Sequence, residues 1–212
     1  MRVVLGLTLF WAVMQQASLA AEPDQTCAGI WANAGSQPHV GDAYTSDEIP
    51  SPNKQSVLSF TEDAIHFSHD GSSPISLSLP INLSLTEVLW AADSSRFAVN
   101  VSDASVDGPW RTFIYTIDTA SKAPKLISIS AIDKERESLT QCEKGKRANL
   151  ATVALLESKE LVIVLEVPSS GACRNRGERL AFRLSPLGEV LERMSMDLLK
   201  QQSAKELGCR LR

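Results

Sequence analysis

From Gln55 onward, apolar residues recur at every second position in short runs that are bounded by turn residues. The clearest run is Ile75-Ser76-Leu77-Ser78-Leu79, in which the apolar and serine side chains alternate strictly. A period of two is typical of a half-buried β-strand, because successive side chains of a strand point to opposite faces of the sheet. The pattern therefore predicts an all-β fold made of short antiparallel strands.

The remaining runs extend this prediction along the chain. They predict strands at 56–60, 64–67, 87–90, 96–101, 111–117, 125–129, 160–167, 179–184 and 189–192. Residues 150–156 are apolar and fit either a strand or a short helix, since periodicity does not separate the two in brief runs. With about 12 strands in all, we expect about three antiparallel four-strand meanders.

The C-terminal segment has the features of a helix over residues 196–207. Ser195 is a suitable N-cap, Asp197 favours the positive end of the helix dipole, and Gly208 suits the C-terminal stop. We expect this short helix to pack on the sheet through Leu198, Leu199 and Leu207.

The N-terminus has the layout of a cleaved secretion signal over residues 1–20. Arg2 is followed by an uncharged apolar run from Val3 to Met14, and Ser18 and Ala20 are small enough for a signal peptidase site. The run is shorter than the roughly 20 apolar residues of a membrane-spanning helix. We therefore expect export to the periplasm or the extracellular space, with no membrane insertion after cleavage.

Residues 21–54 are interpreted as a lead-in arm with an irregular loop and room for one edge strand, and residues 55–212 as a single β domain.

The four cysteines all follow the predicted cleavage site. An even number of cysteines in an oxidising compartment indicates two disulfides. Three pairings are open, and we favour Cys142 with Cys173 and Cys27 with Cys209. The absence of any C-x-x-C pair argues against a zinc or redox site.

The charge balance limits the choice of partner. The chain has 21 basic and 25 acidic residues, and removal of Arg2 with the signal leaves 20 against 25. This mild acidity argues against a nucleic-acid partner, which normally requires a basic face. We expect a monomer with no cofactor, whose partner is a protein or small ligand of the cell envelope.

One segment resembles the blade repeat of TolB-like β-propellers. It starts at the turn Trp90-Ala91-Ala92-Asp93-Ser94-Ser95, continues with Arg96 and an apolar strand, and ends at Tyr115-Thr116-Ile117-Asp118. The family's turn has proline and glycine where this chain has Ala92 and Ser94. Fainter copies begin at Glu157 and at Ser51. Closed propellers typically have 4 to 8 blades, so the resemblance implies either a further blade within residues 21–54 or sheets packed as a sandwich or open array.

Two sequence patterns resemble metal-binding motifs, and neither is complete. Asp103, Ser105 and Asp107 match the opening of a calcium loop, but the twelfth position, which should be glutamate, is Ile114. His66 and His69 are spaced three apart, and a strand directs such residues to opposite faces. We therefore assign no metal ligand, and Asp103, Ser105 and Asp107 remain a weak calcium candidate.

No catalytic motif stands out in the sequence. There is no G-x-S-x-G elbow and no phosphate-binding glycine loop. The sequence therefore favours a non-catalytic binding or envelope-associated protein, and the alternative is a secreted hydrolase whose acidic pair cannot be singled out. Two polar loops, 103–109 and 168–177, are the expected recognition elements, because loops on a rigid sheet often carry binding residues. The candidate contacts are Asp103, Asp107, Trp110, Arg174 and Arg176.

Overall fold

The computed structural model describes residues 48–207 except 62–63, 80–85, 103–108, 141–147 and 170–172. These residues form three four-stranded antiparallel sheets and two helices, so the predicted all-β fold with a short C-terminal helix is confirmed. Each strand pairs with its neighbour in sequence, which makes every sheet a meander. Within the described residues the sheets do not close into a barrel.

The three sheets follow one another along the chain. The first sheet contains β1 (Glu48–Pro50), β2 (Ser56–Phe60), β3 (Ile65–His69) and β4 (Ile75–Leu77). The second contains β5 (Thr86–Trp90), β6 (Arg96–Val101), β7 (Arg111–Ile117) and β8 (Pro124–Leu126). The third contains β9 (Asn149–Leu155), β10 (Leu161–Glu166), β11 (Arg179–Leu184) and β12 (Val190–Ser195). Helix α1 (Ser130–Thr140) connects the second sheet to the third, and α2 (Met196–Leu207) follows β12.

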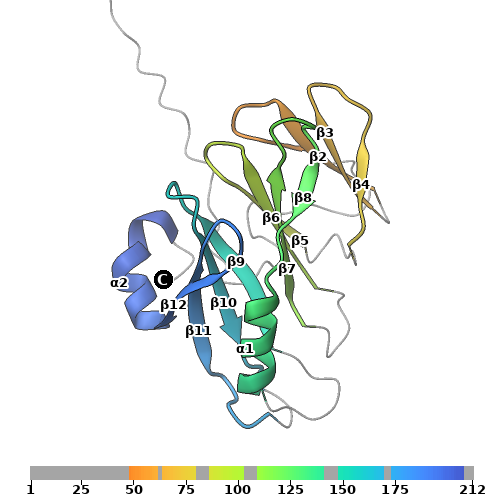
Figure 1. Cartoon of the computed structure of the whole chain (residues 1–212). Coiled ribbons are helices and arrows are strands. Elements are labelled where there is room, and N and C mark those ends of the chain that lie inside the picture. The colour runs from red at the N-terminus through yellow and green to blue at the C-terminus, as the bar shows by residue number, and fades with distance from the viewer. Residues whose placement is uncertain are drawn as a thin grey trace, which may run out of the picture.

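The sheets stack face to face in the order of the sequence, and α2 covers the far side of the third sheet (Figure 1). In the central strand β6, Phe97 and Val99 point to the first sheet, whereas Ala98 points to the third. All six residues of β6 are buried as a result. Because strand side chains alternate between the two faces of a sheet, β6 contributes to the cores on both sides of the second sheet.

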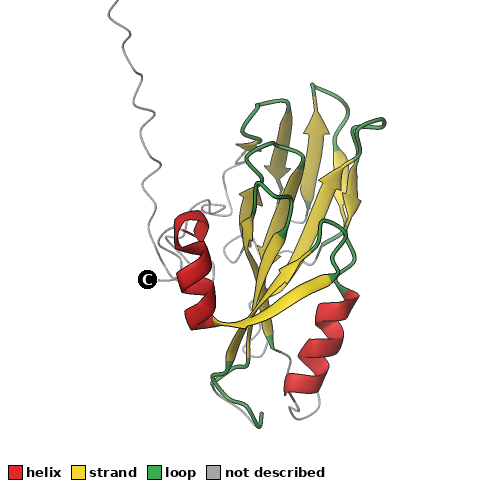
Figure 2. Ribbon diagram, turned by 60° about the vertical axis from the view of Figure 1, so that its left-hand side comes forward, coloured by secondary structure: helices red, strands yellow, loops and turns green. Residues whose placement is uncertain are grey.

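Aromatic rings dominate the core between the first and second sheets. Phe97 stacks on Phe67, with centroids 5.8 Å apart, and on Tyr115, with centroids 4.9 Å apart. Aliphatic residues dominate the core between the second and third sheets, where Ile132 of α1 also packs. On the opposite face of the third sheet, Leu199 of α2 contacts the layer that contains Val162 and Val164. Figure 2 shows the two helices beside the third sheet, one on each side of the view.

Equivalent hairpin turns join the first two strands of each sheet. In each turn one residue has a positive φ, namely Lys54 (62°), Ser94 (60°) and Lys159 (67°). The turns also contact one another: Asn53 N donates to Ser94 Oγ at 3.0 Å, and the Arg96 guanidinium donates to the carbonyls of Leu156 and Lys159. The three meanders are therefore structural repeats whose turns line one end of the stack.

One helix was not expected, and two segments that the sequence left open are assigned by the structure. Helix α1 was not predicted, because Ile132 and Leu139 supply too few apolar positions for a helical period. Residues 48–54 belong to the lead-in arm, which had room for one edge strand; they form the edge strand β1 and the first turn, so the first sheet begins within that arm. Residues 150–156, for which a strand and a helix were both open, belong mainly to strand β9.

The predicted cap of the C-terminal helix is present. Ser195 Oγ accepts a hydrogen bond from Leu198 N at 3.2 Å, as an N-cap residue does. Leu198 and Leu199 pack on the third sheet as expected. The side chain of Leu207 lies outside the described residues.

Candidate functional site

Trp110 lies at the end of the stack opposite the linked hairpin turns. Its main-chain carbonyl accepts from Leu150 N at 3.0 Å, and its main-chain N–H donates to Asn149 Oδ1 at 3.1 Å. Asn149 pairs with Glu166, and Glu166 pairs with Arg179 across the third sheet. The loops before β7 and after β10 therefore start from the same end of the sheets.

Arg174 and Arg176 are exposed in the turn that leads into β11. Between them, Asn175 Nδ2 donates to Leu139 O at 3.1 Å, which ties this turn to the last residues of α1. The structure thus places two arginines, the C-terminal end of α1 and Trp110 at one end of the molecule. We call this region the loop end, defined by Trp110, Leu139, Arg174 and Arg176.

Several residues singled out by sequence lie outside the described part of the chain. These are Asp103, Ser105, Asp107, Cys27, Cys142 and Cys209. Cys173 is described; it is buried in the core between the second and third sheets and is not a free thiol. The pairing of the cysteines and the calcium candidate therefore stay predictions.

A pocket of about 400 Å³ lies beside the loop end, where β8 leaves β7 and the chain enters α1. Its walls combine apolar side chains with two arginines and one aspartate. The lining includes Arg111 and Phe113 of β7, Leu126, Ile129 of the β8–α1 connection, Asp133 and Arg136 of α1, and Leu150 of β9. We call this space the β7 pocket.

Arg136 is a largely enclosed charged group of the β7 pocket. It lies one helical turn from Ile132 on α1, and its side chain is 11% exposed. Arg136 Nη2 contacts Asp133 Oδ1 at 2.9 Å, which orients the guanidinium.

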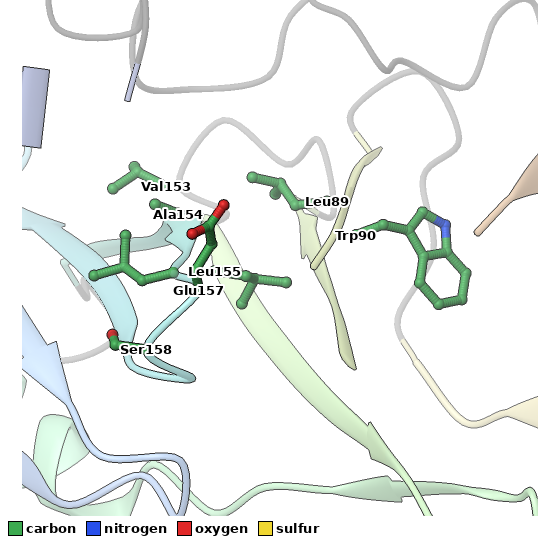
Figure 3. Close-up of a pocket in the computed structure, with 8 residues that line it drawn as sticks. Leu89, Trp90, Val153, Ala154, Leu155, Glu157 and Ser158 are labelled. Carbon is green, nitrogen blue, oxygen red and sulfur yellow. The ribbon is translucent and has the colours of Figure 1, made fainter. Parts of the chain in front are cut away.

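A second pocket, of about 510 Å³, lies between the edge strands β5 and β9. Leu89, Val153, Ala154 and Leu155 line it, and Glu157 and Ser158 stand at its mouth (Figure 3). The indole of Trp90 points away from β9 in this view. Glu157 is the one charged residue among those that line this pocket.

Ser56, His69 and Asp70 lie in a row on the first sheet, with a hydrogen bond between Ser56 and His69 and a contact of His69 with Asp70. Ser56 Oγ lies 2.8 Å from His69 Nδ1, and His69 Nε2 lies 3.3 Å from Asp70 Oδ2. The row has the order of a hydrolase triad, but Ser56 is only 1% exposed, so a substrate cannot reach its hydroxyl. His66 contacts Thr61 instead, at 3.4 Å, so the two histidines do not meet at one site.

The two aspartates of the blade-like segment cap turns. Asp93 accepts from the main chain and hydroxyl of Ser95. Partial burial raises the pKa of Asp93, but these hydrogen bonds and the charges of Arg96 and Lys159 outweigh it, so the net pKa is lowered. Hydrogen bonds from Ser121 and Ala120 likewise lower the pKa of Asp118. Both carboxylates therefore hold turns in shape.

The described part of the chain was also compared with what a metal site, a membrane-spanning helix and a known family require. In the described part of the chain, no group of three or more His, Cys, Asp or Glu side chains is arranged to hold a metal ion. No described helix has the length and apolar character needed to cross a bilayer. No protein-family model matches this chain, and no curated protein matches it.

Sequence reasoning missed the β7 pocket. Arg136 and Asp133 lie in an unpredicted helix, and Leu126 was placed in a longer strand than the structure contains. The acidic and basic residues spaced three apart, Asp133 and Arg136, were the available signal for that helix.

Proposed function

We propose that the mature protein is an exported, non-catalytic binding module that engages a protein or small ligand of the cell envelope through its loop end. One observation carries the proposal: the strand register brings the anchors of both polar loops to the same end, beside the β7 pocket. Loops held by a rigid sheet are common sites of recognition.

The opposite end of the molecule is less suited to recognition. There the hairpin turns form hydrogen bonds to one another through Asn53, Ser94 and Arg96. At the loop end, Arg174 and Arg176 are exposed and Trp110 is half-buried. Arginine and tryptophan are enriched among the residues that contribute most to binding energy.

Export supports the same proposal. The layout of residues 1–20 predicts cleavage after Ala20, and the even number of cysteines suits an oxidising compartment. Intact-mass measurement of the exported protein tests this part. A mature chain that begins at Ala21 is expected, and a mass that retains residues 1–20 would contradict export by cleavage.

Charge reversal at the loop end tests the binding role. The double variant Arg174→Glu and Arg176→Glu should lower the amount of envelope partner recovered with the tagged protein at least about fivefold, because reversed charges remove steering and contacts. The matched control is Lys54→Glu with Lys122→Glu, which makes the same charge change in two exposed turns at the opposite end.

Two results would contradict the proposal. One is equal loss of the partner in both double variants, which would show a general effect of charge. The other is turnover in a hydrolase panel that disappears when one acidic pair is replaced, which would favour the secreted hydrolase.

A further inference from the structure

The pocket between β5 and β9 is bounded by edge strands of two different sheets. Among the described strands, β5 is an outer strand of the second sheet and β9 is an outer strand of the third. The pocket has a volume of about 510 Å³, within the range of about 300–1,000 Å³ that is typical of small-molecule sites. Its described walls are mainly apolar and include Leu89 on β5 and Val153, Ala154 and Leu155 on β9. We call this space the β5–β9 pocket.

The carboxylate of Glu157 points into the β5–β9 pocket. In Figure 3 it lies between Leu89 of β5 and Ala154 of β9. Within the described part of the chain, Glu157 forms no side-chain hydrogen bond and no ion pair. The pocket therefore combines apolar walls with one negative charge that has no counter-charge among the described residues.

The basic residues of the neighbouring turns have other partners. The Arg96 guanidinium donates to the carbonyls of Leu156 and Lys159, one on each side of Glu157 in the hairpin turn. The positive charges of Arg96 and Lys159 also act on the Asp93 carboxylate. Arg96 thus holds in place the turn that carries Glu157, and the Glu157 carboxylate is left for a positively charged ligand.

We propose that the β5–β9 pocket binds an ammonium group that carries an apolar chain, either an aliphatic amine or the amino-terminal residue of a peptide. The ammonium group contacts the Glu157 carboxylate, and the apolar chain packs between Leu89 and Val153. Removal of apolar surface from water supplies most of the affinity, and the carboxylate selects the charge of the ligand. The pocket lies beside the linked hairpin turns, so this site is separate from the loop end and does not rest on the binding role proposed above.

Nuclear magnetic resonance titration of the mature ¹⁵N-labelled protein tests the ligand class. The probes are hexylamine, hexanol and hexanoate, which share one apolar chain and differ in charge. We expect hexylamine to shift the main-chain amide signals of Ala154 and Leu155. Hexylamine should bind about two- to fivefold more tightly than hexanol, which is the range for an ion pair that stays in contact with solvent. Hexanoate should bind more weakly than hexanol, because its charge has the same sign as that of Glu157.

A peptide probe distinguishes the two sources of the ammonium group. Leucyl-glycyl-glycinamide presents an amino-terminal leucine and has no carboxylate. Tighter binding of this peptide than of hexylamine would identify a peptide terminus as the source, and weaker binding would identify an aliphatic amine.

Two matched variants isolate the contribution of the carboxylate. Glu157→Gln should remove the preference for hexylamine over hexanol and leave the affinity for hexanol unchanged. The control is Glu189→Gln, which makes the same charge change at an exposed residue outside the lining and should keep the preference. Leu89→Ala should weaken the binding of hexylamine and hexanol alike, because it removes part of an apolar wall. If Leu89→Ala does not fold, the variant at the exposed residue Glu157 still decides the result.

Three results would overturn the proposal. One is that hexylamine leaves the amide signals of Ala154 and Leu155 unchanged, the second is equal affinity for the three probes, and the third is an unchanged preference in Glu157→Gln. None of these results bears on the loop end, which Arg174→Glu with Arg176→Glu tests separately.

Discussion

The side-chain amide of Asn100 makes two hydrogen bonds with the Thr152 main chain. Asn100 Nδ2 donates to Thr152 O at 2.8 Å, and Thr152 N donates to Asn100 Oδ1 at 2.9 Å. The same Nδ2 donates to Glu87 Oε2 at 2.8 Å. Asn100 thus bonds to the edge strand β9 as a neighbouring strand would, and it links the second sheet to the third.

Asn100→Ala should destabilise the protein by about 3 kcal/mol. Asn100 is fully buried, and its loss leaves the N–H and C=O of Thr152 without these partners, at about 1–3 kcal/mol for each buried group. Urea unfolding measures the change in the free energy of unfolding. Asn175→Ala, which removes an exposed side-chain hydrogen bond, is the control and should cost under about 1 kcal/mol. Equal losses in the two variants would contradict this role of Asn100.

Gly188→Ala should cost more than Gly71→Ala. Both glycines have positive φ, 86° and 72°, so alanine is strained by about 1 kcal/mol at each. A Cβ on Gly188 would lie 2.1 Å from Ser128 O, whereas a Cβ on Gly71 would meet nothing within 4 Å. We expect a further loss of about 2 kcal/mol at Gly188, since overpacking typically costs 1–3 kcal/mol. Thermal unfolding of both variants tests this, and equal melting temperatures would refute the contact.

Tyr115 should make the protein lose stability in alkali. Burial raises the pKa of Tyr115 to about 12, whereas an unfolded tyrosine has a pKa of about 10. The stability is therefore complete below pH about 10 and declines as the pH rises from about 10 to about 12. Absorbance titration of a Tyr44→Phe background isolates the Tyr115 phenol. Tyr115→Phe should reduce the alkaline decline, and a phenol that titrates near 10 in the folded protein would contradict the prediction.

The predicted pairing of Cys142 with Cys173 gains support from the contact between Asn175 and Leu139. Cys173 is two residues from Asn175, and Cys142 is three residues beyond Leu139 in sequence. Non-reducing peptide mapping of the mature protein tests the pair. Cys142→Ser should cost roughly 3 to 4 kcal/mol, as expected for a loop of this length. Recovery of Cys142 as a free thiol from the native protein would contradict the pairing.

Much of the fold is predictable because each sheet uses a simple alternation. The strands at 56–60, 96–101, 111–117 and 179–184 match the structure at both ends, since their apolar residues recur at every second position and turn residues bound them. The loop end was predictable in part: both polar loops follow the second strand of a meander, and stacked repeats bring such loops to the same end. The resemblance to TolB-like propellers stays a prediction.

The contacts between sheets are not predictable in this way. Asn100 and Thr152 are 52 positions apart, and their pairing depends on the angle at which β9 meets the second sheet. Arg136 and Asp133 were hidden because α1 carries few apolar residues.

Site-specific photo-crosslinking in cells that export the protein is the most direct test of the loop end as the binding surface. A photoreactive residue replaces Arg176 in one variant and Ser158 in another; both positions are exposed, and Ser158 lies in a hairpin turn at the opposite end. We expect a discrete adduct from position 176 and little or none from position 158. An adduct from position 158 that equals or exceeds the adduct from position 176 would contradict the account.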